Sequence, residues 1–193
     1  MRARLTRFTA CAGTEAVLAR VYRAEVLPAG LALPGLTRMV LLLNQVTQAG
    51  LALSLWDGEP GRPVPELVPA FTRQLAAHDD PALYDVSAWV RATSDPTRAS
   101  VVVSRAAEGR LNYAIDVTRQ VILPNVAQQP GFSGSALFSD AASGALVNAT
   151  AWRAEADMEA FVRTPAAERG VAALQRHLAE PMLVQVYTIL VMY

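Results

Sequence analysis

The sequence predicts an α+β protein built from two tandem ferredoxin-like βαββαβ units that pack as an internal pseudo-dimer. Two observations support this fold class. The first is an internal repeat, in which Pro124 lies 96 positions after Pro28. The second is that both copies show the same alternation of strand and helix patterns.

The repeat is clearest between residues 26–56 and 122–152, which align without a gap and share 7 of 31 residues. The polar stretch 93–97 is the natural linker, so we expect one unit over 1–94 and another over 98–193. The matching pairs include three turn-forming residues and a tryptophan: Pro28 and Pro124, Pro34 and Pro130, Gly35 and Gly131, and Trp56 and Trp152.

In the second copy, the β-branched run Val101–Val103 predicts the first strand. Leu111, Ile115 and Ile122 share one helical face, and Pro124 is expected to end that helix. The predicted elements are a strand at 100–105, a helix at 111–123, a hairpin at 132–139 and 144–152, helices at 154–161 and from 164, and a strand at 182–192.

The first copy follows the same order. Its predicted elements are a strand at 3–10, a helix at 14–27, a hairpin at 36–56, a helix at 65–77 and a strand at 83–91. In this fold the helices cover one face of the sheet. The opposite face is apolar here, as Leu51, Leu53 and Leu55 show, so we expect the second copy to cover it.

Composition excludes some classes of function. Lys+Arg and Asp+Glu both total 17, a balance that argues against nucleic-acid binding. The longest apolar runs are too short for a membrane span, and no apolar leader follows Met1, so a cytoplasmic location is expected. Cys11 is the only cysteine, which rules out an intramolecular disulfide and a cysteine-rich zinc site.

The second hairpin strand carries a recognisable pattern. Pro130, Gly131 and Phe132 precede it, Asn148 and Trp152 lie four residues apart near its end, and an acidic helix follows up to Phe161. This resembles the antibiotic biosynthesis monooxygenase (ABM) family of dimeric α/β barrels. The resemblance implies a pseudo-dimeric α/β barrel and leaves further pairing into a homodimer open.

Some members of that family oxidise aromatic polyketide phenols or anthrones with molecular oxygen and need no metal or organic cofactor. The resemblance therefore implies an ABM-like monooxygenase that takes a small aromatic substrate and O2, with no cofactor. In those proteins an Asn and a Trp on this strand line the substrate pocket. Asn148 and Trp152 match them and are the candidate catalytic residues, whereas the first copy has Ala52 and Trp56.

The physical chemistry is compatible with that role. Residues 148 and 152 point to the same side of a strand, and both side chains carry N–H donors that could hold a phenolate or enolate. The substrate itself would supply the electrons. The further candidates for substrate binding are Trp56, Asn112, Tyr113 and Phe132.

Other interpretations remain open. In one of them Trp56 and Trp152 serve only to pack the core, and Asn148 is a buried amide whose hydrogen bonds are all made within the protein. A non-catalytic module that binds a hydrophobic ligand or another protein is one alternative. A haem-binding or haem-degrading relative is a second, although Val171 stands where such relatives have an axial histidine. His78 and His177 are expected at helix C-termini, in a surface role.

Overall fold

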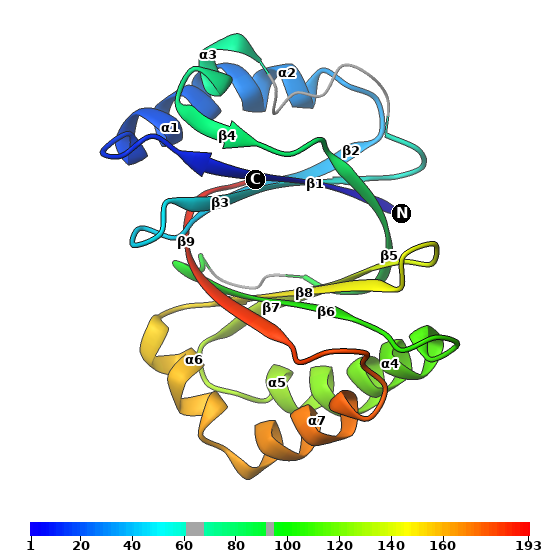
Figure 1. The fold of residues 1–193 in the computed structure, drawn as a ribbon. Helices are drawn as coiled ribbons and strands as arrows, with labels where there is room; N and C mark the ends of the chain where they lie inside the picture. The colour runs from blue at the N-terminus through cyan, green and yellow to red at the C-terminus, as the bar shows by residue number, and fades with distance from the viewer. Residues whose placement is uncertain (61–67, 92–94) are drawn as a thin grey trace. The chain divides into compact units, whose positions relative to one another are not determined.

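The computed structural model describes residues 1–60, 68–91 and 95–193, and it has the α+β class that the sequence predicts (Figure 1). The chain divides into two compact units. The first contains Met1–Asp85 together with Tyr187–Tyr193, and the second contains Val86–Val186. No helix in the described part of the chain is long and apolar enough to cross a membrane.

The second unit has the ferredoxin-like order of strands, β9-β6-β8-β7, with its helices on one face of the sheet (Figure 1). Antiparallel pairing of β8 with both β6 and β7 forms its centre. The elements are β6 (Arg98–Arg105), α4 (Leu111–Val117), η3 (Thr118–Ile122), α5 (Leu123–Ala127), β7 (Phe132–Asp140), β8 (Ala145–Trp152), α6 (Glu155–Val162), α7 (Pro165–Gln175) and β9 (Leu183–Met192).

The first unit repeats this arrangement. Its third strand pairs with the first and second strands, as β8 does in the second unit. The elements are β1 (Arg2–Ala10), α1 (Glu15–Val21), η1 (Tyr22–Val26), α2 (Leu27–Leu31), β2 (Leu36–Leu43), β3 (Ala49–Trp56), α3 (Pro69–Thr72), β4 (Leu75–His78) and β5 (Ala82–Val90). The α+β class and the ferredoxin-like order are therefore confirmed.

The last strand of each repeat is divided between the compact units. In β5, Ala82–Asp85 belong to the first unit, where they pair with β1, and the following residues belong to the second. In β9 the residues from Tyr187 onward belong to the first unit, where they pair with β2. The covalent repeats and the compact units thus differ at the ends of these two strands.

The first helix of each repeat runs past its proline, which corrects the expectation that Pro124 ends it. A π-helical turn precedes the proline in both copies, and in it Leu123 N–H donates to the Thr118 carbonyl five residues back. Leu27 N–H donates to Tyr22 in the same way. In an α-helix the proline ring would collide with the carbonyl four residues earlier, and the wider π-helical turn moves that carbonyl out of the way. The helix therefore restarts and continues to Ala127.

The predicted second helix of the first repeat, at 65–77, is largely wrong. Residues 65–67 lie outside the described residues, and beyond them only Pro69–Thr72 are helical. Leu75–His78 instead form β4, which pairs with the end of β1. Along β1, β5 pairs with Arg2–Leu5 and leaves the end of β1 open to a further strand. The pairing of Leu75–His78 with that end outweighs the helix propensity of Ala76 and Ala77. His78 therefore lies on a strand.

The Pro-Gly turn is equivalent in both repeats. Gly35 and Gly131 have φ angles of 82° and 80°, and each accepts a hydrogen bond from the residue after the repeat tryptophan. The N–H of Asp57 donates to Gly35 at 2.7 Å and that of Arg153 to Gly131 at 2.8 Å. Glycine is required because other residues seldom adopt a positive φ of this size. The turn thereby fixes the end of the third strand beside the start of the second.

We predict that Gly131→Ala lowers the free energy of unfolding by about 2–3 kcal/mol, measured by urea denaturation. An added Cβ would be strained at this φ and would also collide with the carboxylate of Asp157. Gly109→Ala is the matched control, because Gly109 has a φ of 69° but no atom within 4 Å of the added Cβ. Its cost should be about 1 kcal/mol. Equal costs for the two variants would contradict the proposed collision.

A candidate ligand cavity in the second unit

A cavity of about 710 Å³ lies between the sheet and the helices of the second unit. Its described lining residues all fall within Val86–Val186, so this unit forms the cavity alone. A volume of this size is typical of small-molecule sites. The cavity is therefore a candidate ligand site.

The floor of the cavity is one face of β6 and β8. Side chains alternate along a strand, so even-numbered residues of these strands point together toward the helices. The register places Ser100 opposite Thr150 and Val102 opposite Asn148. The floor residues are Ser100, Val102, Ser104, Leu146, Asn148, Thr150 and Trp152.

The walls are formed mainly by small and apolar side chains of the helices and of β9. The proline-containing helix contributes one side, and α6 and α7 contribute the other. Two residues of β9, together with Met182 just before that strand, complete the wall. The main wall residues are Thr118, Ile122, Asn125, Val126, Met158, Phe161, Val162, Ala167, Gly170, Val171, Leu174, Met182, Val184 and Val186. Such a surface fits an apolar ligand that has few polar groups.

The cavity lies where the core of the second unit is interrupted. One buried cluster includes Leu137, Leu146 and Leu174, and another contains Trp152 and Met158. Residues of both clusters line the cavity. Packed side chains of both clusters thus border the cavity.

Asn148 is the centre of a hydrogen-bonded group on the floor. Its Oδ1 accepts a hydrogen bond from the Thr150 hydroxyl at 3.1 Å. Its Nδ2 donates to Ser135 Oγ and to the Ala136 carbonyl, both at 3.4 Å, which is long for an N–H···O bond. The amide is therefore held in place, but the two hydrogen bonds that its Nδ2 group donates are weak. A ligand oxygen could compete for them.

Trp152 is buried, with 1% of its surface exposed, and its Nε1–H donates to Ser100 Oγ at 3.1 Å. Its ring is packed by Phe132, with centroids 6.4 Å apart, and by Phe161, with centroids 5.7 Å apart. The indole thus forms part of the apolar wall. Its polar N–H reaches the cavity only through Ser100.

The cavity is almost uncharged. Among its described lining residues, Glu168 is the single ionisable side chain, and it is exposed on the first turn of α7. Across the described parts of the chain, no group of three or more His, Cys, Asp or Glu side chains could hold a metal ion. The arrangement can therefore bind a neutral aromatic ligand and offer hydrogen bonds from hydroxyl and amide groups to its oxygen atoms.

The structure brings only part of the predicted site together. Asn148 and Trp152 both line the cavity, whereas Phe132 lies against the far side of the Trp152 ring. Asn112 is exposed on α4, and Tyr113 is 55% exposed beside it. Trp56 is buried in the first unit, where its Nε1–H donates to Ser54. Asn112, Tyr113 and Trp56 are not among the residues of this cavity.

The two histidines lie outside the cavity. His78 is exposed on β4 of the first unit. His177 follows α7, as expected, and its ring stacks on Tyr113 with centroids 5.8 Å apart. Val171 lines the cavity from α7. None of the described lining residues is a His, Tyr or Cys, the side chains that most often ligate haem iron through nitrogen, oxygen or sulfur.

No family model and no curated protein matches the sequence. Solved structures do match, several of them over nearly the whole chain. A candidate monooxygenase from Lactobacillus acidophilus NCFM has a TM-score of 0.74 at 7% identity, over 99% of this chain and 93% of the other. An anthrone oxidase-like protein has a TM-score of 0.67 at 13% identity, over 100% and 92%.

A third structure is an uncharacterised ferredoxin-fold protein from Listeria monocytogenes that is related to antibiotic biosynthesis monooxygenases. It has a TM-score of 0.61 at 12% identity, over 98% of this chain and 94% of the other. The chain has the same ferredoxin-like fold. A haem-degrading enzyme from Listeria monocytogenes shares that fold, with a TM-score of 0.59 at 10% identity over 97% and 99%.

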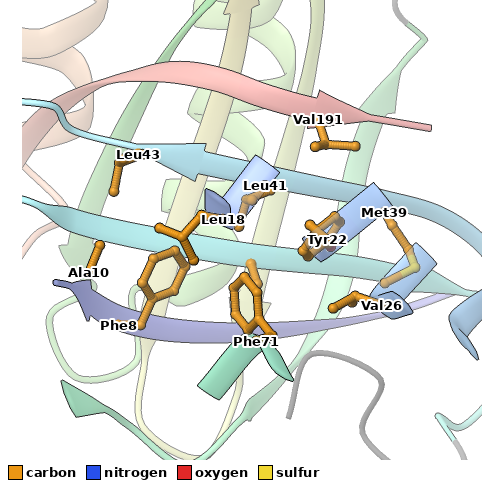
Figure 2. Close-up of a cluster of buried hydrophobic side chains, with 11 residues drawn as sticks. Phe8, Ala10, Leu18, Tyr22, Val26, Met39, Leu41, Leu43, Phe71 and Val191 are labelled. Carbon is orange, nitrogen blue, oxygen red and sulfur yellow. The ribbon is translucent and has the colours of Figure 1, made fainter. Parts of the chain in front are cut away.

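Within this fold, the first unit fills the equivalent space with side chains. The repeat offset pairs Ser104 with Phe8, Thr118 with Tyr22, and Ser135 with Met39. Figure 2 shows Phe8, Tyr22 and Met39 in one buried cluster with Phe71. The Phe71 ring packs edge-on against Phe8 and Tyr22, with centroids 5.7 and 5.6 Å apart. Small polar residues in one copy thus replace large ones in the other.

Sequence analysis missed the serines of the cavity. Ser100 and Ser104 lie on the first strand of the repeat and line the cavity. Ser135, on the second strand, accepts a hydrogen bond from Asn148. A signal was present, because Ser100, Val102 and Ser104 share one face of a strand, and serine is uncommon on the covered face of a sheet. Finding it required the register between β6 and β8, which the sequence alone does not reveal.

We predict that a variant carrying the first-unit residues, Ser104→Phe, Leu146→Gly and Thr118→Tyr, fills the cavity. The glycine is needed because the Phe8 ring lies over Gly50 in the first unit. Wild-type protein should bind 2-hydroxyanthraquinone at one site per chain, measured by quenching of tryptophan fluorescence, and the variant should lose this binding. Tyr113→Ala, on the exposed face of α4, is the control and should still bind.

The filled variant should remain folded, with its free energy of unfolding within about 3 kcal/mol of wild type. Binding by a folded variant at the wild-type affinity would contradict the assignment of the cavity as the site. Two equivalent sites per chain in the wild type would contradict the filled state of the first unit.

Proposed function

We propose that the protein is an ABM-like monooxygenase that uses O2 to oxidise an aromatic substrate of the anthrone, quinol or polyketide type, without a cofactor. The observation that supports this most is the cavity itself. It is mainly apolar, it has the volume of a small-molecule site, and its polar groups are gathered on one floor beside Asn148. The shared fold with an anthrone oxidase-like protein supports the same conclusion.

The proposed chemistry balances without a further reductant. An anthrone loses a proton to give its electron-rich enolate, and this anion transfers an electron to O2. The resulting carbon radical and superoxide combine to form a C–O bond. The peroxide anion takes up a proton, which balances the one lost at the start, and the hydroperoxide then loses water to give the quinone. One O2 is consumed for each CH2 converted to C=O, and one water is released. All the electrons come from the substrate.

In this proposal the protein binds and orients the substrate and stabilises its anion. The walls hold the rings, while Asn148 on the floor offers N–H donors to the substrate oxygen. Trp152 supplies an apolar surface, and its indole N–H is directed at Ser100. An apolar cavity makes these hydrogen bonds stronger than they would be in water.

A second candidate function is a non-catalytic module that holds a hydrophobic ligand. The observation favouring it is that both Nδ2 hydrogens of Asn148 already have acceptors within the protein. In addition, the one ionisable lining residue, Glu168, is exposed, so the described cavity offers no buried base. Such a module would bind the same aromatic compounds and leave them unchanged.

A haem-handling function receives less support. A haem-degrading enzyme shares the fold, but this chain has Val171 where the resemblance places the axial histidine. The lining residues that could ligate iron are Met158 and Met182, and methionine alone is an unusual haem ligand. The residues present therefore do not fit a haem site of the usual kind.

The decisive experiment is oxygen uptake with anthrone, followed at an oxygen electrode and by the absorbance of the quinone product. Wild-type protein dialysed against EDTA should consume one O2 per anthrone, faster than buffer alone. Asn148→Ala should lower kcat about 10- to 100-fold, because it removes a donor to the developing anion. Asn112→Ala, a change of the same kind on the exposed face of α4, should keep the wild-type rate.

The result also separates the candidates. Binding of anthrone without oxygen uptake would overturn the oxygenase and favour the binding module. Equal effects of the two asparagine substitutions would show that Asn148 has no part in the reaction. A Soret band on titration with haem, with loss of that band in Met158→Leu, would favour the third function.

A further inference from the structure

The hydrogen bond between Trp152 and Ser100 determines how the tryptophan can act. An indole N–H is a donor only, and here it is directed at Ser100 Oγ at 3.1 Å. Trp152 is buried, with 1% exposure, so its N–H has no open path to a ligand. Ser100 therefore accepts from the indole and keeps its own hydroxyl proton to donate.

The cavity-facing hydroxyls differ in what they do with their protons. Thr118 donates to the Ala114 carbonyl at 2.9 Å, and Thr150 donates to Asn148 at 3.1 Å. Within the described parts of the chain, the hydroxyls of Ser100 and Ser104 donate to no protein acceptor, and both side chains line the cavity. These two serines are therefore the hydroxyl donors available to a ligand.

The first unit shows what the tryptophan does without a ligand site. Trp56 donates to Ser54 on its own strand at 3.0 Å, and Arg4, which occupies the position of Ser100, lies over the ring at 5.3 Å. In the second unit, Thr150 takes the place of Ser54 and bonds to Asn148. With Thr150 bonded to Asn148, the Trp152 N–H donates its hydrogen bond to Ser100, whose side chain faces the cavity.

We propose that Ser100 donates its hydroxyl hydrogen bond to the oxygen of the bound aromatic ligand, and that Trp152 acts through it as a positioning residue. This rests on the proposed function, because it assumes an aromatic ligand with a phenolic or enolic oxygen. The indole donor orients the Ser100 hydroxyl and makes it a stronger donor, since hydrogen bonds in a chain polarise one another. The substrate oxygen thus lies over β6 at its Ser100 end.

The uncharged lining makes this donor important. No described Lys, Arg or His side chain lines the cavity, so a bound phenolate is stabilised by neutral donors alone. Transfer into an apolar cavity raises the pKa of a phenol, and each hydrogen bond to the anion lowers it. The pKa of a bound phenol therefore reports directly on the donor that touches its oxygen.

The test uses 2-hydroxyanthraquinone, which is already oxidised and whose phenolate absorbs at longer wavelength than the phenol. The pKa of the bound probe is measured by absorbance across a pH series with protein in excess. Ser100→Ala should raise that pKa by about 1–2 units, because it removes a donor to the anion. Ser104→Ala removes the other available hydroxyl, four residues along the same strand, and should raise the pKa less than Ser100→Ala does, because the Trp152 N–H donates to Ser100. Tyr113→Ala, on the exposed face of α4, is the control and should leave the pKa unchanged.

A double-mutant cycle tests the role of Trp152. Trp152→Phe should raise the pKa of the bound probe in the wild-type background and should add nothing in the Ser100→Ala background. A purely structural role would give the same shift in both. Ser100→Ala alone still carries the test if the phenylalanine variant fails to fold, because it leaves the ring in place.

The inference is overturned if Ser100→Ala leaves the pKa of the bound probe unchanged, or if Ser104→Ala raises it as much. These outcomes are distinct from a failure of the proposed oxygenase. If the protein binds the probe and Ser100→Ala shifts its pKa, but no oxygen is taken up with anthrone, the proposed role of Ser100 is supported and the proposed oxygenase is overturned. A wild-type protein that does not bind the probe would overturn both.

Discussion

The register between β6 and β8 is the constraint on which the cavity depends. It places Ser100 opposite Thr150 and Val102 opposite Asn148, so that the polar residues of two distant segments form one floor. A shift by one residue would turn all of them to the other face of the sheet. The Pro-Gly turn fixes the neighbouring pairing of β8 with β7, because Gly131, just before β7, accepts a hydrogen bond from Arg153, directly after the end of β8.

The same scaffold holds either a packed core or an open cavity, and a few positions decide which. Phe8, Tyr22 and Met39 fill the first unit where Ser104, Thr118 and Ser135 border or support the cavity of the second. The backbone is preserved to the level of a π-helical turn before each proline. Large apolar side chains therefore pack the first unit, whereas smaller polar ones at the same positions leave a cavity in the second.

The sequence predicts the strands of both copies because hydrophobic alternation, the Pro-Gly turn and the repeat all indicate the same boundaries. It fails where tertiary contacts override local preference. Leu75–His78 have the composition of a helix but pair with β1, and Pro124 has the appearance of a helix end but follows a π-helical turn. Neither feature could be deduced from the local sequence, because each depends on a partner or a backbone geometry elsewhere.

The candidate site shows the same division. Asn148 was identifiable because an amide in an apolar strand needs a reason, and the resemblance supplied one. The sequence does not reveal how a helix is rotated about its axis, and the structure places Asn112 and Tyr113 at the surface of α4. Ser100 went unnoticed because its importance arises from the Trp152 N–H, and that contact joins residues 52 positions apart.

An uncharged floor also determines how such a site would choose its ligands. A cavity lined by charges attracts any ion of the opposite sign, but hydroxyl and amide groups act only at short distance and in fixed directions. A ligand whose oxygen fails to reach the floor would leave polar groups of the protein unpaired in an apolar space, at a cost of about 1–3 kcal/mol each. Selectivity would therefore depend less on the rings, which the apolar walls accept in many forms, than on where the ligand carries its oxygen.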